Sequence, residues 1–283
     1  MKFGIQYNSA YYGVDPDVIA GYAKHAQDCG FESIFIPEHV VLYPGATLGT
    51  TRIDPSLPLL DPLACLGFIT AATERIILGT AVLQLPYHHP VTLAKRLATI
   101  DVLSKGRMRL LTIGLGSLPG ESDALGIDHA TRGRRADEAI DVMRLLWAGD
   151  ATGVSFSGEF FAFSNLVSFP KPHHARTLPI HVAGSTRPAA RRAGLRGDGY
   201  FAGGRVGSEE RALQIDLMRA TAREAGRDAD RIELSRWGSI EMSQDDVEAL
   251  AAAGATRVVV SATSADPQVQ REEISAFAER LKL

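Results

Sequence analysis

The 283-residue chain contains only two cysteines, Cys29 and Cys65. Two thiols in a chain of this length cannot form a disulfide framework, which excludes the class of small secreted domains stabilised by disulfides. Both cysteines fall in segments predicted to be outer helices. We therefore expect both thiols to be buried and unreactive.

The sequence also lacks a long apolar run and a strong charge of either sign. No stretch approaches the roughly 18 apolar residues of a membrane-spanning helix, and the segment MKFGIQYNSA is typical of a short strand rather than a signal peptide. The formal net charge is −3, and no predicted element combines a basic stripe with interleaved aromatic side chains. These features predict a cytoplasmic protein with neither a membrane nor a nucleic acid as its partner.

The rest of the composition is that of an ordinary globular protein, with 45% hydrophobic and 22% charged residues. Short β-type runs alternate with longer amphipathic segments, a pattern typical of βαβ units and a parallel sheet. Eight such runs, each followed by a helical segment, favour a (β/α)₈ barrel that occupies residues 1–283 as a single domain. The predicted strands are Lys2–Tyr7, Ser33–Ile36, Ile76–Val82, Met108–Ile113, Pro179–Ala183, Gly199–Ala202, Ile232–Ser239 and Arg257–Ser261.

Several helices carry recognisable start and stop signals. Proline at the first helical position is predicted for Asp15-Pro16, Asp61-Pro62 and His89-Pro90. Ser208 and Ser243 are predicted N-caps. Gly30 and Gly254 are predicted to end the first and seventh helices.

Two connections are too long to be simple turns, and both follow predicted strands at the end where such barrels form their sites. They span Pro37 to Leu60 and Leu115 to Ala130, and we expect them to shape a pocket and determine its specificity. A third excursion, VSFSGEFFAF, alternates around Ser157-Gly158 and predicts a small hairpin before the fifth strand.

His39 is the best candidate for a catalytic residue. It follows the second strand, which places an imidazole at the rim where barrel enzymes position catalytic groups. A histidine at a strand end can also be a purely structural, hydrogen-bonded residue. Glu38 has the opposite parity along the strand, which indicates a structural partner or loop anchor rather than a second acid.

The third and fourth strands end in small residues. The run from Leu78 to Gln84 contains Gly79, Thr80 and Ala81, which would let a planar ring lie against the backbone or simply allow tight strand packing. Gly114 and Gly116 follow the fourth strand, but the third glycine and the distant acid of a dinucleotide fingerprint are missing at the required spacing.

The fifth and sixth strands lead into two turns that could bind an anion. Ala183-Gly184-Ser185-Thr186-Arg187 places backbone N–H groups, two hydroxyls and an arginine at a helix N-terminus. Ala202-Gly203-Gly204-Arg205 is a second glycine turn that could approach a phosphate. Each turn alone could be an ordinary capped connection. Their adjacency favours a phosphate site.

The remaining histidines and arginines give weaker signals. Neither His88-His89 nor His173-His174 has metal-ligand spacing with a partner carboxylate, so we predict no metal site. The clustered arginines are interpreted as solvated helix faces, with contact to an anionic cofactor tail as the alternative. They are Arg132, Arg134 and Arg135, followed by Arg191 and Arg192.

The chain resembles the luciferase-like monooxygenase superfamily, in particular its bacterial members that use coenzyme F420, a deazaflavin. The resemblance runs nearly end to end. It is carried by four segments: FESIFIPEHV, ATERIILGTAVLQLPYHHPVTLAKRLATIDVLSKGRMRLLTIGLG, RGRRADEAIDVMRLLW and PIHVAGSTRPAARRAGLRGDGYF.

The resemblance implies a barrel with the cofactor over the carboxyl ends of its strands. The ring would rest on a backbone bulge with a non-proline cis peptide, which by motif position is Ala81–Val82. His39 would lie beside the reactive face and assist proton transfer, while Gly184 and Ser185 would meet the ribityl-phosphate. With the strand-end residues above, the expected cofactor contacts are Ala81, Val82, Leu83, Gln84, Gly114, Gly116, Ala183, Gly184, Ser185, Thr186, Gly203 and Gly204.

The chain also departs from some members of the superfamily. Some deazaflavin dehydrogenases carry a glutamate just after the fourth strand, where this chain has Gly116-Ser117, so a two-residue proton relay does not transfer. Trp147 and Trp237 both lie outside the loop after the second strand, where the sugar-phosphate dehydrogenases place a tryptophan. Sugar phosphate is therefore not a favoured substrate.

These observations lead to three functional hypotheses. The first is hydride transfer between a small organic substrate and F420, with His39 moving a proton. The alternative is an FMN-dependent monooxygenase that uses reduced flavin and oxygen, and a further alternative is a non-catalytic flavin- or deazaflavin-binding protein. A homodimer is plausible for this family, and the sequence does not name the substrate.

Overall fold

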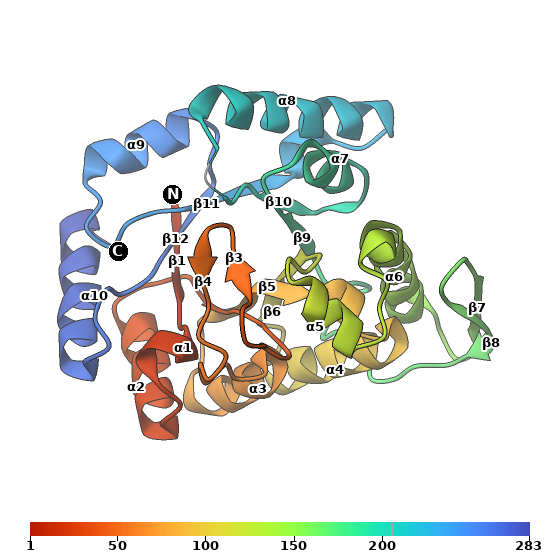
Figure 1. Ribbon diagram of the computed structural model, residues 1–283, viewed down its shortest axis with the longest axis horizontal. Coiled ribbons are helices and arrows are strands. Elements are labelled where there is room, and N and C mark those ends of the chain that lie inside the picture. The colour runs from red at the N-terminus through yellow and green to blue at the C-terminus, as the bar shows by residue number, and fades with distance from the viewer. Residues whose placement is uncertain (205) are drawn as a thin grey trace.

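The computed structural model describes residues 1–204 and 206–283, and eight parallel strands within them close into a barrel (Figure 1). Their order around the barrel is β1-β12-β11-β10-β9-β6-β5-β2, so strands adjacent in the chain are adjacent in the barrel. This confirms the predicted fold class. The strands are β1 (Lys2–Gln6), β2 (Ser33–Ile36), β5 (Ile77–Gln84), β6 (Met108–Gly114), β9 (Ile180–Ala183), β10 (Gly199–Phe201), β11 (Glu233–Trp237) and β12 (Arg257–Val260).

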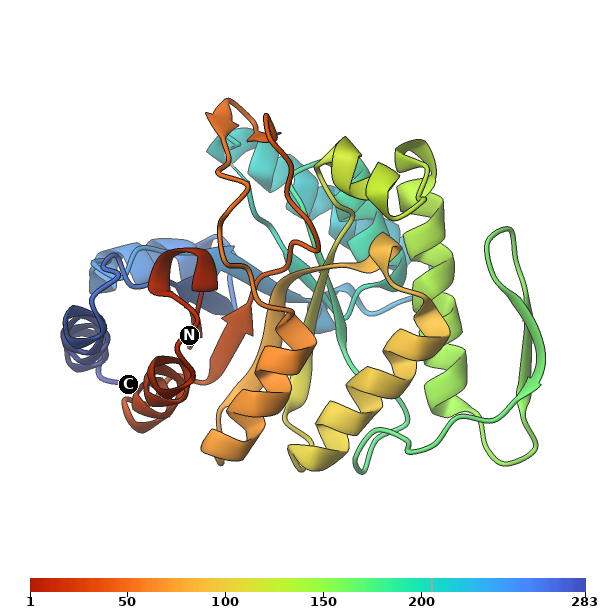
Figure 2. The ribbon, with the colours of Figure 1, turned by 60° about the horizontal axis from the view of Figure 1, so that its bottom comes forward.

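One long helix follows each barrel strand and covers its outer side (Figure 2). These helices are α2 (Pro16–Asp28), α3 (Pro62–Ala72), α4 (Pro90–Leu103), α6 (Arg132–Ala148), α7 (Arg187–Arg196), α8 (Ser208–Glu224), α9 (Gln244–Ala252) and α10 (Pro267–Leu281). No helix within the described residues is both long and apolar enough to cross a lipid bilayer.

Shorter elements lie in the connections. They are α1 (Ser9–Tyr12), β3 (Thr47–Leu48), β4 (Thr51–Arg52), η1 (Leu85–Tyr87), α5 (Pro119–Ala124), η2 (His129–Thr131), β7 (Val154–Ser157), β8 (Ala162–Leu166) and η3 (Ala229–Arg231). The β3–β4 pair and α5 lie within the two long loops predicted to shape a pocket, and both stand above the same end of the barrel (Figure 2).

Most of the predicted helix boundaries are confirmed. Proline occupies the first turn of α2, α3 and α4, Ser243 forms a capping box at α9, and Gly30 and Gly254 follow helix ends at positive φ. The prediction for Ser208 is wrong: it is the first residue of α8, and Gly207 is the N-cap. Gly207 adopts the extended conformation that an N-cap requires, with φ −61° and ψ 160°.

The third barrel strand is longer than predicted. β5 continues to Gln84, because its register against β6 shifts between Ala81 and Leu83 and pairing then resumes at Leu83 opposite Ile113. The peptide bond between Ala81 and Val82 is cis, as the resemblance implied. The bulge therefore lies at the carboxyl end of β5.

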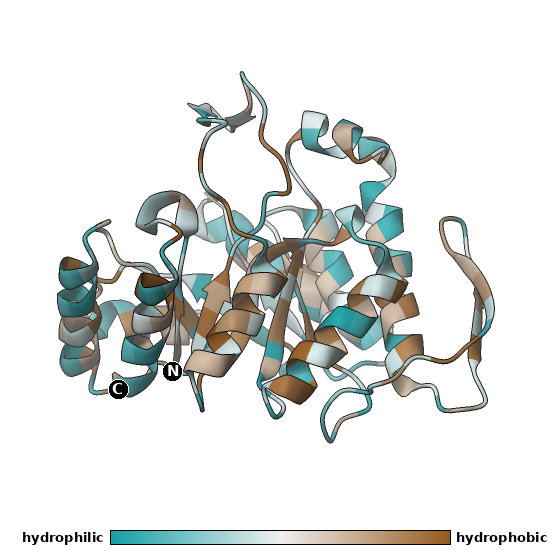
Figure 3. Ribbon diagram, turned by 90° about the horizontal axis from the view of Figure 1, so that it is seen from below, coloured by the Kyte–Doolittle hydropathy of each residue, from teal (hydrophilic) through white to brown (hydrophobic). Residues whose placement is uncertain are grey.

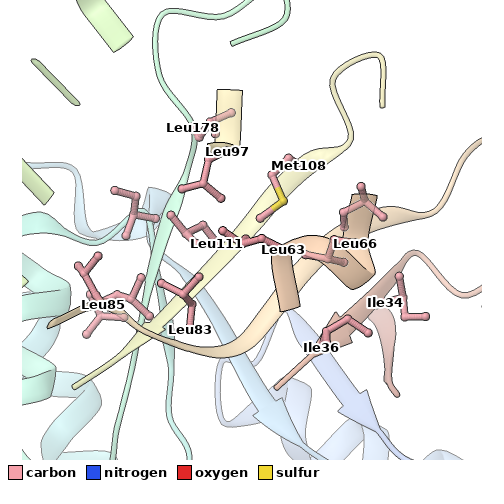
Figure 4. Packing of buried hydrophobic residues seen from close by; sticks show 14 of the residues in the cluster. Ile34, Ile36, Leu63, Leu66, Leu83, Leu85, Leu97, Met108, Leu111 and Leu178 are labelled. Carbon is pink, nitrogen blue, oxygen red and sulfur yellow. The ribbon is translucent and has the colours of Figure 1, made fainter. Parts of the chain in front are cut away.

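The core forms two layers because strand residues alternate in direction. Hydrophobic side chains on the outer side of the barrel pack under the helices, and the close-up in Figure 4 shows Ile34 and Ile36 of β2 with Leu63 and Leu66 of α3. Inside the barrel, a smaller cluster contains Phe35, Ala81, Leu110, Phe201 and Val259. Figure 3 shows the mostly hydrophobic strands enclosed by helices with hydrophilic outer faces.

Glycines make room for the aromatic ring inside the barrel. A Cβ atom on Gly4 would come within 2.6 Å of the Phe35 ring, and one on Gly79 within 2.8 Å. Side chains at these positions would collide with Phe35. The ring therefore fills the barrel interior below the bulge of β5.

Two surface predictions need correction. Cys65 is buried, and burial raises the pKa of its thiol to about 12, but Cys29 is only half-buried because it lies at the edge of α2 beside His25 and Ser275. Arg192 was interpreted as solvated, yet it is 9% exposed. Its guanidinium donates two hydrogen bonds to Asp137, of 2.6 and 3.1 Å, which join α7 to α6.

The predicted hairpin is present as β7 and β8, with a four-residue connection between them. The carboxylate of Glu138 on α6 accepts hydrogen bonds from the backbone N–H groups of Glu159, Phe160 and Phe161. This one side chain therefore attaches the tip of the hairpin to α6.

A network of charged side chains closes the amino-terminal end of the barrel. Arg257 is 2% exposed and donates to both carboxylate oxygens of Glu32 and, at 2.8 Å, to Glu233. Burial alone would raise the pKa of Glu233, but hydrogen bonds from Lys2 and Arg257 lower it to about 2. His181 lies in the same cluster, and burial together with Arg257 lowers its pKa to about 4.

This network predicts that His181 makes the fold sensitive to acid. Its pKa is about 4 in the folded protein against an ordinary value of 6.5, so neutral His181 contributes stability above pH 6.5 that is lost as the pH falls toward 4. We expect this residue to account for roughly 3 kcal/mol of the loss. Urea unfolding of the wild type and of His181→Gln between pH 7.5 and 4 measures it; curves with the same pH dependence would contradict the assignment.

Candidate functional site

A cavity of about 460 Å³ opens at the carboxyl ends of the barrel strands. It lies between the ends of β2, β5, β6, β9, β10 and β11, beneath the two long loops seen at the top of Figure 2. Its lining residues are Glu38, His39, Val82, Gln84, Gly114, Leu115, Gly116, Ser117, Arg132, Ala183, Gly184, Ser185, Thr186, Ala189, Phe201, Gly203, Gly204 and Trp237.

Nearly all of the residues proposed from the sequence to meet a cofactor line this one cavity, together with His39. Ala81 and Leu83 do not. Leu83 is fully buried in the hydrophobic layer under the helices, and Ala81 lies in the barrel interior, where its carbonyl accepts a hydrogen bond of 3.2 Å from Gln6. Arg205 follows the strand-six glycines in the sequence and lies outside the described residues.

His39 is half-buried, with 19% of its side chain exposed. Its Nδ1 lies 3.1 Å from Oε2 of Glu121 and 3.2 Å from Nε2 of Gln84. Within residues 1–204 and 206–283, Nε2 of His39 has no hydrogen-bond partner. One ring nitrogen is therefore held by the protein, and the other is available to a molecule in the cavity.

Glu121 is a buried contact of His39 that the sequence did not predict. It is 0% exposed, and besides His39 its carboxylate accepts hydrogen bonds from the N–H groups of Val40 (2.6 Å) and Val41 (3.3 Å) and from Gln84 Nε2 (3.3 Å). In some deazaflavin dehydrogenases a glutamate is expected directly after the fourth strand, where this chain has Gly116-Ser117. The glutamate comes a few residues later, in the first turn of α5, where Pro119 at the start of a helix was the available signal.

Glu38 is a structural anchor, as its parity predicted. It is 4% exposed; one carboxylate oxygen accepts a hydrogen bond of 2.6 Å from the backbone N–H of Gln84, and the other lies 2.9 Å from Nε2 of His88. The backbone carbonyl of Glu38 accepts from Gln84 Nε2 at 2.9 Å. These contacts attach the end of β2 to the end of β5.

The opposite side of the cavity offers unpaired backbone donors. The amides of Ser185 and Thr186 donate to no group that the structure describes, while the Thr186 side chain caps α7 by accepting from the N–H of Ala189. Gly204 allows this turn to approach the next one, since a Cβ atom there would lie 2.5 Å from the Ser185 hydroxyl oxygen. Such donors at a helix N-terminus favour a bound anion.

Arg211 holds the second glycine turn in place. It is 6% exposed, and its guanidinium donates three hydrogen bonds of 2.7 Å to the carbonyls of Ala202, Gly203 and Gly204. With its carbonyls engaged from behind, this turn keeps a fixed shape beside Ser185. The buried cation also adds positive charge to the end of the cavity that the sequence predicted to bind a phosphate.

Among the lining residues not proposed for the site are one charged and two aromatic side chains. Arg132 was interpreted as part of a solvated face, yet it lies at the start of α6 on the cavity wall. Trp237 and Phe201 form an aromatic surface, with ring centroids 4.8 Å apart. Aromatic rings of this kind suit a flat, apolar group, and Arg132 suits an anionic one.

A chain of hydrogen bonds links Tyr87, Ser122 and His129. Tyr87 Oη lies 3.0 Å from the Ser122 hydroxyl, which in turn lies 3.0 Å from Nδ1 of His129. Burial raises the pKa of Tyr87, and burial with the nearby charge of Arg132 lowers the pKa of His129. These contacts hold α5 against η1.

Across residues 1–204 and 206–283, no group of three or more His, Cys, Asp or Glu side chains is arranged to hold a metal ion. His88 is engaged by Glu38, and His173 and His174 lie with their ring centroids 4.0 Å apart. The chemistry available at the site is therefore that of His39 at one end and of amide donors at the other.

The fold and the cavity define a (β/α)₈ barrel protein with a ligand site at the carboxyl ends of its strands. The sequence profile of the luciferase-like monooxygenase family matches residues 2–282. The chain belongs to this family.

Two curated relatives illustrate the activities named in the family. An F420-dependent glucose-6-phosphate dehydrogenase of Nakamurella multipartita is 30% identical over 82% of this chain and 65% of its own length. A 4-hydroxyprotoasukamycin monooxygenase of Streptomyces nodosus subsp. asukaensis is 32% identical over 81% of this chain and 59% of its own length. The chain thus spans less than two thirds of the length of these relatives.

Solved structures show the same fold. A monooxygenase from Streptomyces bottropensis has a TM-score of 0.78 at 23% identity, covering 100% of this chain and 99% of its own. An F420-dependent secondary alcohol dehydrogenase in complex with an F420-acetone adduct has a TM-score of 0.76 at 19% identity, with coverage of 100% and 99%. At these identities the likeness concerns the fold.

Gly116 provides a test of how tightly the cavity wall is built. Its φ is +79°, and a Cβ atom would lie 2.2 Å from Tyr87 Oη and 3.0 Å from Gln84 Oε1. Gly126 in the same loop also has positive φ, +67°, but nothing within 4 Å of its Cβ position. Because both share the backbone cost of about 1–2 kcal/mol, Gly116→Ala should lose about 1–3 kcal/mol more than Gly126→Ala in urea unfolding, through overpacking. Equal losses of unfolding free energy in the two variants would show that Tyr87 and Gln84 move aside at little cost and would contradict the overpacking.

Proposed function

We propose that this protein is an F420-dependent oxidoreductase that transfers a hydride between a small organic substrate and the deazaflavin, with His39 moving a proton. The observation that carries the proposal is the position of His39: its Nε2 is available at the rim of a cavity whose other end presents amide donors. The relative that is an F420-dependent dehydrogenase supports the choice of cofactor.

The residues of the cavity fit a ring cofactor with a phosphate-bearing chain. The cavity lining includes five glycines, which add no side chain to the wall: Gly114, Gly116, Gly184, Gly203 and Gly204. A Cβ atom on Gly114 would lie 2.6 Å from Val82. The Ser185 and Thr186 amides, with Arg211 behind the neighbouring turn, suit a phosphate. Trp237 and Phe201 offer an apolar surface to a flat ring or to the substrate.

When bound, a deazaflavin supplies the hydride acceptor or donor for the substrate carbon. His39 holds or releases a proton at Nε2 as the substrate changes between alcohol and carbonyl. Glu38 and Gln84 keep the ends of β2 and β5 together, so the imidazole stays next to the bulge at Val82. The two long loops stand above the end of the barrel where the cavity opens.

A second candidate is an FMN-dependent monooxygenase. It is favoured by the relative named as a monooxygenase, which is as similar to this chain as the dehydrogenase is. The amide donors would serve the FMN phosphate equally well, since a phosphate is common to both cofactors. The two candidates differ in the ring that they use and in the consumption of oxygen.

Titration of the apo-protein with F420 and with FMN, each followed by fluorescence, tests the choice between them. We expect saturable binding of F420 at micromolar or lower concentration and weaker binding of FMN. Tight binding of FMN without affinity for F420 would overturn the proposal in favour of the monooxygenase. Oxygen consumption with reduced FMN and a substrate panel would then identify that activity.

Replacement of His39 tests its catalytic role. His39→Ala should leave the dissociation constant of F420 nearly unchanged and reduce kcat by roughly 10²–10⁴-fold, the usual contribution of a general acid or base. His89→Ala is the matched control, because His89 is exposed at the start of α4 and lines no part of the cavity. Unchanged turnover in His39→Ala would exclude His39 as the group that moves the proton.

Other features predicted from the sequence stay predictions. These are the single-domain organisation of residues 1–283, the cytoplasmic location, the homodimer, the small-molecule substrate and the absence of a metal requirement.

A further inference from the structure

Glu121 is a fully buried carboxylate whose partners are all positioned to donate. Its Oε1 accepts from the backbone N–H groups of Val40 and Val41, and its Oε2 accepts from Gln84 Nε2 and faces Nδ1 of His39 at 3.1 Å. A buried carboxylate without such donors would carry a desolvation cost of several kcal/mol. The four contacts offset that cost and allow the charge to stay beside His39.

The side-chain amide of Gln84 can adopt only one of its two flipped orientations. Its Nε2 lies 2.9 Å from the carbonyl oxygen of Glu38 and 3.3 Å from the Glu121 carboxylate, and both of these groups only accept hydrogen bonds. The NH₂ group must therefore stand there, and Oε1 faces the other way, where it has no partner among the described residues. Nε2 of Gln84 also lies 3.2 Å from Nδ1 of His39, but it has only two hydrogens, and the Glu38 carbonyl and the Glu121 carboxylate can accept both. A hydrogen bond from Gln84 to Nδ1 would instead leave the Glu121 oxygen facing a ring lone pair at 3.1 Å.

These contacts determine where the proton of a neutral His39 lies. A carboxylate oxygen cannot donate, so Nδ1 must carry the hydrogen in the contact with Glu121. A neutral imidazole then has its lone pair on Nε2, the nitrogen at the cavity rim. In this state His39 can accept a proton from a substrate hydroxyl, and after doing so its positive charge lies next to Glu121.

We propose that Glu121 is the positioning residue for His39, holding the imidazole in the Nδ1–H tautomer so that Nε2 is the proton acceptor. This inference rests on the proposed function only for its catalytic consequence. The tautomer itself is a property of the protein without substrate.

A simpler role for Glu121 would be to anchor the loop after β2 through Val40 and Val41. Glu138 on α6 has that role alone: it accepts from three backbone N–H groups of the β7–β8 connection and lines no part of the cavity. Glu138→Gln is therefore the matched control for Glu121→Gln, since both replace a loop-anchoring carboxylate by its neutral isostere.

The first experiment measures the tautomer in the wild-type protein. In protein labelled with ¹⁵N-histidine, long-range ¹H–¹⁵N correlation spectra distinguish protonated from unprotonated ring nitrogens, and the His39 signals among the eight histidines are those lost in His39→Ala. Spectra are recorded at rising pH until the His39 ring carries a single proton, and in that neutral form we expect a protonated Nδ1 and an unprotonated Nε2. A neutral His39 with its proton on Nε2 would overturn the inference, whatever the cofactor or substrate proves to be.

The second experiment is a double-mutant cycle on turnover. A glutamine at position 121 can turn its NH₂ group toward Nδ1 and hold the opposite tautomer, so Glu121→Gln should lower kcat by at least about tenfold and by no more than His39→Ala does, roughly 10²–10⁴-fold. In the His39→Ala background the same change should have little further effect on kcat, because Glu121 acts through His39. Glu138→Gln should leave kcat unchanged in both backgrounds.

The outcomes separate the two roles of Glu121. Additive losses of kcat, or a rise in KM with kcat unchanged, would show that Glu121 serves only as a loop anchor and would refute the positioning role. If Glu121→Gln does not fold, the tautomer measurement on the wild type still decides the question. Failure of the proposed function would appear instead as the absence of F420 binding, with the tautomer unaffected.

Discussion

The buried carboxylate of Glu121 is the contact on which the arrangement of the site depends. It joins the two long loops, because α5 in the loop after β6 carries it and the chain just beyond β2 supplies His39 and the amides of Val40 and Val41. Gln84 brings the end of β5 to the same point. Three strand ends that are separate in the sequence are thereby held together around one charge, and the imidazole has little freedom to rotate.

The two ends of the barrel differ in the side chains that they present. At the amino-terminal end, Arg257 lies between Glu32 and Glu233, so the buried guanidinium is paired with two carboxylates. At the carboxyl end, several residues of the cavity lining are glycines, and the amides of Ser185 and Thr186 have no acceptor within residues 1–204 and 206–283. The charged network and the candidate ligand site thus lie at opposite ends of the barrel, the division expected for this class of barrel.

Much of the fold and part of the site could be predicted from the sequence because both are encoded locally. The alternation of β-type runs with amphipathic helices is visible within short windows, and helix signals such as Asp15-Pro16 or the Ser243 capping box depend on neighbouring residues. The cavity-lining glycines were found because they follow strands, and parallel strands place all their carboxyl ends on one side. The error at Ser208 was of one residue, where local signals carry the least information.

What the sequence did not reveal are contacts between residues that are far apart in the chain. Glu121 lies 82 residues from His39, and nothing in its own neighbourhood distinguishes a buried ligand of an imidazole from an exposed acidic residue in a first helical turn. Arg192 was misjudged for the same reason, because its partner Asp137 lies 55 residues away on another helix. Charged residues acquire their roles from the partner that the fold brings to them, and for that reason a search confined to the residues directly after a strand passes over the glutamate that holds the histidine.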